Sequence, residues 1–126
     1  MKRIISTDEA PEAVGAYSQA TTNGDLLFTA GQIPMTPEGE LLDDEDITTQ
    51  TNQSLENVVG ILEEEGCSVD DVLKVTVFLD DIDDFDAMNA AYKEFFSEDP
   101  PARSAVEVAN LPKGVGVEIE AIADSS

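Results

Sequence analysis

The heptapeptide LKVTVFL at residues 73–79 is the feature that most constrains the fold of this chain. It is β-branched and apolar on both faces, which is typical of a strand covered on both sides. Apolar residues recur at helical spacing before it, over residues 47–65, and after it, over residues 85–96. A strand between two amphipathic helices predicts that both helices act as crossovers and pack against one sheet.

The ends of the two helices carry their own signals. Asp46 is suited to cap the start of the first helix, and Gly66 is suited to stop it. Asp83 or Asp84 can cap the second helix. The apolar stripe of that helix comprises Phe85, Met88, Tyr92, Phe95 and Phe96.

Asn23-Gly24 is a strong hairpin signal between strands expected at residues 19–22 and 26–31. Three further strands are expected at residues 3–6, 104–109 and 117–123. The order predicts one α+β domain over residues 1–126, with a mixed sheet and two helices on one face. The other sheet face, which we expect to carry Thr29, Thr76 and Phe78, has the apolar content of a surface that packs on another subunit.

The charge of the chain restricts its partners. Six Lys and Arg residues stand against 28 Asp and Glu residues, a net charge of −22. The acids are spread over helices, loops and strand ends, as is typical of proteins adapted to multimolar salt, where screening weakens self-repulsion. Nucleic-acid binding is disfavoured, since it requires clustered Lys and Arg. No apolar run is long enough to span a membrane, and the lone Cys67 fits a reducing cytoplasm.

Several kinds of chemistry are excluded by composition. The chain has no His, which removes His-based acid–base catalysis and most transition-metal sites. A lone Cys without His cannot form a thiol-protease pair. The acidic run at residues 80–86 lacks the Gly and Glu positions of a calcium-binding loop, so no metal site is expected.

Arg103 is the most conspicuous polar residue that remains, because it lies between a Pro-Pro-Ala turn and an apolar strand. Glu118 and Glu120 share one face of the last strand. If strand 104–109 pairs with strand 117–123, Arg103 lies near one of these glutamates. A structural ion pair and an anion-binding site both fit this expectation.

Three other polar residues are candidates for a site: Asn89 beside the apolar stripe, Tyr17 in a Gly-containing loop, and Gln32 after the first hairpin. Asn89 and Tyr17 also have simpler structural interpretations. Asn89 can be a core amide bonded to backbone, and Tyr17 can be a packed aromatic.

Six stretches occur in order over nearly all of the chain: GAYSQA (15–20), FTAGQIP (28–34), NQSLENV (52–58), NAAYKEFF (89–96), PPARSAVEVANLP (100–112) and VEIEAIA (117–123). This set resembles the YjgF/RidA family of reactive-intermediate deaminases. The resemblance implies a chorismate-mutase-like α+β fold and a homotrimer with ligand sites in the three clefts between subunits. It implies hydrolysis of 2-imino acids and their enamine tautomers, such as 2-iminobutanoate and 2-iminopropanoate, to 2-keto acids and ammonia, without a cofactor.

The same resemblance assigns roles to residues of this chain. Arg103 matches the family's carboxylate-binding arginine, and Glu118 matches its water-positioning acid. Substrate-binding positions match at Tyr17, Gly31 and Asn89, and at the backbone of Ala105. Two residues depart from the family pattern, because many members have Ser where this chain has Ala30, and Cys or Thr where it has Ala105.

Three other functions compete with the deaminase. The first is a non-catalytic trimer that binds keto or amino acids as a regulator, which the alanines at positions 30 and 105 make plausible. The second is a ribonuclease or translation inhibitor, against which the net charge argues. The third is a chaperone that acts through exposed apolar surface.

Overall fold

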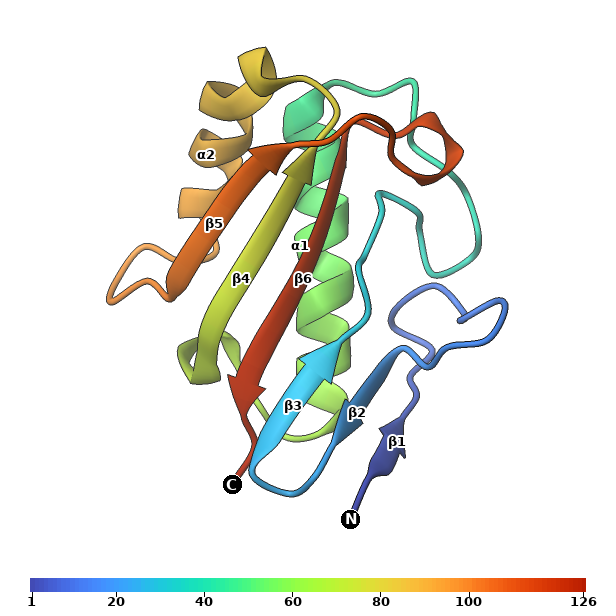
Figure 1. Cartoon of the computed structure of the whole chain (residues 1–126), viewed down its shortest axis with the longest axis vertical. Coiled ribbons are helices and arrows are strands. Elements are labelled where there is room, and N and C mark those ends of the chain that lie inside the picture. Colours follow the sequence, from blue (N-terminus) through green and yellow to red (C-terminus); the bar gives the residue numbers. More distant parts are fainter.

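A six-stranded mixed sheet carries the fold, and the computed structural model describes all 126 residues. The strands lie in the order β1-β2-β3-β6-β4-β5, with helices α1 and α2 on one face of the sheet (Figure 1). The predicted α+β class is thereby confirmed. The elements are β1 Arg3–Ile5, β2 Ala20–Thr22, β3 Leu26–Thr29, α1 Ile47–Glu64, β4 Val72–Leu79, α2 Phe85–Lys93, β5 Ala102–Glu107 and β6 Val117–Asp124.

The position of β5 contradicts one prediction. Strand β5 does not pair with β6, but runs parallel to β4, with Val75 opposite Arg103. Strand β6 is inserted between β3 and β4 and is antiparallel to both. The reason is that α2 provides the crossover that parallel strands need, while residues 108–116 carry the chain past the end of β4 to its other side.

The predicted helix signals are largely confirmed. The carboxylate of Asp46 caps α1, since it accepts a hydrogen bond from the backbone N–H of Thr49 at 2.8 Å. Gly66 follows the end of α1 with φ of 77°, a conformation that favours glycine. Asp84 precedes α2 but makes no capping hydrogen bond through its side chain, and α2 ends at Lys93 rather than at residue 96. No helix of the structure has both the length and the apolar character needed to cross a membrane.

The two faces of the sheet differ sharply in burial. Leu27, Val75, Val77 and Ile119 point toward the helices and are fully buried. Thr29 also lies on this side, contrary to the prediction, and its hydroxyl accepts a hydrogen bond from the backbone N–H of Ala121 at 3.0 Å. The alternation of β3 places its neighbour Phe28 on the other face instead.

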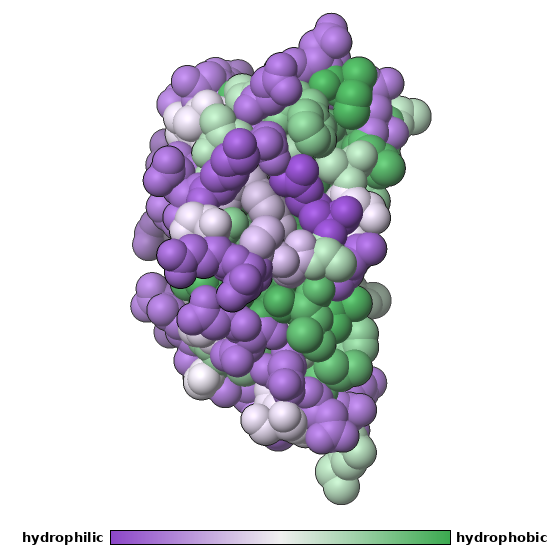
Figure 2. Space-filling view, turned by 90° about the vertical axis from the view of Figure 1, so that its left-hand side faces the viewer, coloured by the Kyte–Doolittle hydropathy of each residue, from purple (hydrophilic) through white to green (hydrophobic).

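The sheet face away from the helices has no layer over it. Phe28 and Val106 are each 44% exposed there, and Thr76 and Phe78 of β4 share this face. Figure 2 shows apolar residues gathered along this side of the molecule, on the right of the view, while hydrophilic residues cover the helical side. An apolar sheet face of this kind is typical of a surface that packs against another protein chain.

Candidate functional site

Arg103 lies on the edge strand β5 and turns toward the helices. Its Nη1 donates a hydrogen bond to Oδ1 of Asn89 at 2.8 Å. The guanidinium carbon lies 4.6 Å from the ring centre of Tyr92 and 5.5 Å from that of Phe85. All three neighbours come from α2, where their spacing at positions 85, 89 and 92 puts them on one helix face.

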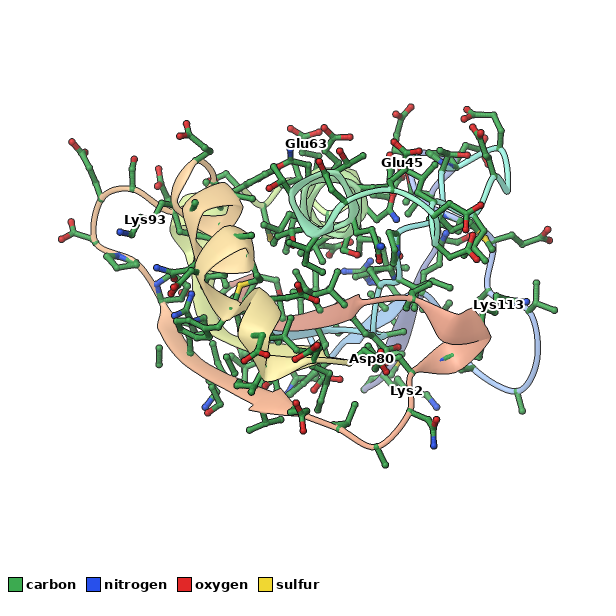
Figure 3. The ribbon with its side chains drawn as sticks, turned by 90° about the horizontal axis from the view of Figure 1, so that it is seen from above. Lys2, Glu45, Glu63, Asp80, Lys93 and Lys113 are labelled. Carbon is green, nitrogen blue, oxygen red and sulfur yellow. The ribbon has the colours of Figure 1, made fainter.

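Arg103 has no carboxylate partner within the chain. The only ion pair joins the other arginine, the exposed Arg3, to Glu65. The ion pair considered for Arg103 with Glu118 or Glu120 is therefore absent from the structure. Figure 3 shows Glu45 and Glu63 projecting outward from the molecule, as expected of solvated acids. A partly buried arginine without a carboxylate partner, in a chain with 28 acidic residues, leaves N–H donors available for an external anion.

Glu118 lies on the uncovered face of the sheet, opposite Phe78 of β4. Its carboxylate is packed against Gly31, where an added Cβ would lie only 2.5 Å from Oε2 of Glu118. Gly31 thus leaves the space that the carboxylate occupies. The two residues border a cavity of about 430 Å³, whose lining is completed by Tyr17, Ala30, Ile33, Pro112 and Lys113.

The surroundings of Glu118 favour its protonated form. Partial burial raises the pKa of this carboxyl above its usual value, and the neighbouring Glu120 raises it further. Glu120 itself is exposed and lies opposite Thr76. A carboxyl with a raised pKa, set in a cavity, has the properties expected of a group that exchanges protons with a ligand.

Within one chain, the candidate residues form two groups on opposite sides of the sheet. Arg103 and Asn89 lie on the helix side, as does Ala105, which packs partly against the core. Tyr17, Gly31 and Glu118 lie together at the cavity. The prediction that Arg103 lies near Glu118 or Glu120 is wrong for a single chain, because β4 separates their strands and the side chain of Arg103 leaves the opposite face of the sheet.

Gln32 is a sequence candidate with a structural role, and Tyr92 is a contact residue that the sequence did not single out. Gln32 is buried, and its backbone N–H and C=O both bond to Ile119, at 2.7 and 3.0 Å, so that it anchors the segment that carries Gly31. The sequence places Tyr92 only in the apolar stripe of α2, although its ring is the nearer of the two aromatic rings to the guanidinium. Its position three residues after Asn89 was the available signal.

Comparison with known proteins agrees with this architecture and with the motifs. Residues 7–125 match the family described as endoribonuclease L-PSP. The chain belongs to this family, which is the YjgF/RidA family that its motifs resemble.

Individual relatives are similar over nearly their whole length. A RutC family protein of Pyrococcus horikoshii is 55% identical, over 98% of both chains. The 2-iminobutanoate/2-iminopropanoate deaminase of Salmonella typhimurium is 48% identical, again over 98% of both chains. The crystal structure of E. coli TdcF with bound serine superimposes with a TM-score of 0.93 at 48% identity and 98% coverage of both chains. The family thus includes imine deaminases and a member seen with an amino acid bound.

Proposed function

We propose that this protein hydrolyses 2-imino acids, such as 2-iminobutanoate and 2-iminopropanoate, to 2-keto acids and ammonia. The observation that carries the proposal is Arg103, partly buried and without a carboxylate partner. Its guanidinium can bind the carboxylate of a 2-imino acid through two parallel N–H donors. The similarity to deaminases at 48% identity supports the same reaction.

The separation of Arg103 from Glu118 supports a site built from two copies of the chain. The uncovered sheet face supplies apolar surface for such packing. In a closed ring of three copies, Arg103 of one copy would meet Glu118 of the next, so that each cleft would receive both residues. The homotrimer is thus part of the proposal.

In the first chemical step, Arg103 holds the substrate carboxylate and thereby fixes the position of C2. Glu118 orients a water molecule and accepts one of its protons as the oxygen bonds to C2. The substrate reacts as its protonated iminium form, whose C=N double bond becomes a single bond as its electron pair moves to nitrogen. The product of this step is a carbinolamine, with Glu118 protonated.

In the second step, Glu118 returns its proton to the nitrogen of the carbinolamine. The C–N bond breaks as the hydroxyl oxygen forms the carbonyl, and ammonia leaves with the hydroxyl proton as ammonium. The iminium carbon is strongly electrophilic, so a weak base suffices. Most of the acceleration is expected from positioning of water and substrate.

Mixing two inactive variants tests whether each site is shared between copies. Arg103→Ala and Glu118→Gln are each expected to retain at most about 1% of the wild-type activity alone. When both chains are unfolded, mixed in equal amounts and refolded, about a quarter of the clefts should combine an intact Arg103 with an intact Glu118. Activity should therefore return to roughly that fraction of the wild-type value.

The control for this test is each variant refolded alone, which should stay at its low residual activity. Sedimentation should show the same trimer in every sample. Mixed trimers without recovered activity would contradict a site shared between copies.

Gly31→Ala is expected to reduce activity strongly with little loss of stability. The new methyl group would collide with the Glu118 carboxylate, which is the flexible end of a side chain and can rotate away. The fold is thereby preserved while the carboxylate leaves its position, and a displacement of about 1 Å can cost roughly 100-fold in rate. Imine hydrolysis and thermal unfolding measure the two effects separately.

Gly60→Ala is the matched control for this prediction. Its Cβ would lie 2.7 Å from the backbone oxygen of Glu9, which cannot rotate away. We expect its melting temperature to fall by roughly 5 °C while the rate per folded molecule is unchanged. If Gly31→Ala keeps full activity, Glu118 does not need the position seen here.

A keto- or amino-acid sensor is the second candidate function, because TdcF is seen with bound serine. Ala30 and Ala105 supply no side-chain hydrogen bonds, which would slow catalysis more than binding. A sensor would be stabilised by 2-oxobutanoate or serine and would not accelerate imine loss.

A further inference from the structure

We propose that Tyr92 is a positioning residue whose ring orients the Arg103 guanidinium for the substrate carboxylate. The inference rests on the proposed function, since it concerns how the same arginine binds its anion. It gives Tyr92, a buried residue of helix α2, a role in ligand binding.

The contact between the two side chains is close and direct. The guanidinium carbon lies 4.6 Å from the centre of the Tyr92 ring, nearer than the 5.5 Å that separates it from Phe85. A cation over an aromatic face at this distance is attracted by the negative face of the ring. The attraction keeps the planar guanidinium against α2.

The hydrogen bond to Asn89 adds a second restraint. Nη1 donates to Oδ1 of Asn89 at 2.8 Å, while Nη2 and Nε of Arg103 have no hydrogen-bond partner. One end of the fork is therefore fixed by α2, and the other donors remain for a ligand. The ring and the amide together restrict the rotations of the Arg103 side chain before a ligand arrives. Less conformational entropy is then lost on binding.

The hydroxyl of Tyr92 distinguishes the role of the ring from that of the polar tip. Tyr92 is only 4% exposed, and its Oη has no hydrogen-bond partner. Burial raises the pKa of this hydroxyl, while the nearby positive charge of Arg103 opposes that rise. Because the hydroxyl bonds to nothing in the chain, its removal should cost little stability. The ring is thus the part whose loss should affect Arg103.

Tyr92 also belongs to the hydrophobic core and packs against Phe96, with ring centres 4.8 Å apart. A purely structural role would therefore also make its substitution destabilising. Phe96 provides the matched control, because it is buried in the same cluster and forms no cation–π contact with Arg103.

The experiment compares Tyr92→Leu, Tyr92→Phe and Phe96→Leu with the wild type. KM and kcat are measured for 2-iminobutanoate, binding of 2-oxobutanoate is measured by calorimetry, and stability is measured by thermal unfolding. Tyr92→Leu is expected to raise KM and to weaken 2-oxobutanoate binding, each by about tenfold, with kcat changed less than about twofold. Tyr92→Phe should keep wild-type values, and Phe96→Leu should lose stability with KM unchanged.

Three results would overturn the inference. In the first, Tyr92→Leu lowers stability but leaves both KM and binding unchanged, so that the ring is only structural. In the second, Tyr92→Phe weakens binding as much as Tyr92→Leu, so that the hydroxyl rather than the ring acts. In the third, Phe96→Leu raises KM as much as Tyr92→Leu.

Other outcomes separate this inference from the proposed function. If the wild type binds 2-oxobutanoate without hydrolysing imines, weaker binding by Tyr92→Leu would still support the positioning role while the deaminase fails. If Tyr92→Leu does not fold, Phe85→Leu replaces it. Its KM is expected to rise by about threefold, less than for Tyr92→Leu, since Phe85 is farther from the guanidinium. An unchanged KM in Phe85→Leu would then count against the aromatic support.

Discussion

Arg103→Ala is expected to lower kcat/KM for 2-iminobutanoate by roughly 100- to 1,000-fold. The substrate carboxylate would lose its hydrogen-bonded cation, and truncating one partner of such a charge pair costs about 2–5 kcal/mol. Stability should fall by no more than about 1–2 kcal/mol, because within the chain the guanidinium makes one hydrogen bond, contacts with two aromatic rings and no ion pair. Steady-state kinetics and thermal unfolding on the same preparation measure both effects.

Two further arginine variants sharpen this prediction. Arg3→Ala removes the only other arginine, which is exposed and paired with Glu65, and should leave kcat/KM unchanged. Arg103→Lys keeps the charge but loses the planar fork and the stacking on Tyr92, so we expect only partial activity. Equal activities of Arg3→Ala and Arg103→Ala would remove Arg103 from the site.

Glu118→Gln is expected to lower kcat by roughly 100- to 10,000-fold, the range of general acid–base catalysis. The amide fills the same space beside Gly31 but cannot accept a proton from water. KM should change much less than kcat. A kcat within a few-fold of the wild type would show that Glu118 is not the base.

The pH dependence of the wild type follows from the same carboxyl. Its pKa is raised by burial and then by Glu120, and the base must be ionised. The rate should therefore be low below the raised pKa and increase as the pH rises through it. Glu120→Gln removes the neighbouring charge, so the acid limb should move to lower pH while the plateau rate stays the same. If Glu120→Gln leaves the acid side of the pH–rate profile unchanged, a group other than Glu118 controls that part of the profile.

Raising the pH through the pKa of Glu118 should increase the activity but lower the stability of the fold. Because the pKa of Glu118 is higher in the folded state than in the unfolded state, its contribution to stability is fully present below the unfolded pKa. That contribution is lost as the pH rises through the folded pKa. At neutral pH, Glu118→Gln should therefore be at least as stable as the wild type.

The order and type of the main elements could be predicted from the sequence. The periodicity of α1, the hairpin at Asn23-Gly24 and the apolar strand β4 are local signals, and each appears at its expected place within a few residues. The pairing of the last strands could not be predicted in this way. Residues 104–109 and 117–123 are joined by a short turn-rich segment, which reads as a hairpin, but β6 pairs with β3 and β4 instead.

The error in strand order had a direct consequence for the site. Local sequence signals identified Arg103, Tyr17 and the pair Glu118 and Glu120, and the family resemblance added Gly31. Neither could tell which of these residues meet. That depends on which sheet face each side chain leaves, and on what a second chain brings. The role of Tyr92 was missed for a related reason, since a core residue and a support for a cation have the same helical periodicity.

The measurement that tests the account most directly is imine hydrolysis by the wild-type protein. 2-Iminobutanoate is generated from threonine by a salt-tolerant pyridoxal-phosphate dehydratase, and formation of 2-oxobutanoate is followed in multimolar KCl and in dilute buffer. We predict that the wild type accelerates 2-oxobutanoate formation and that Arg103→Ala does not. If the correctly assembled wild type leaves the rate of spontaneous hydrolysis unchanged under both conditions, the deaminase proposal is wrong.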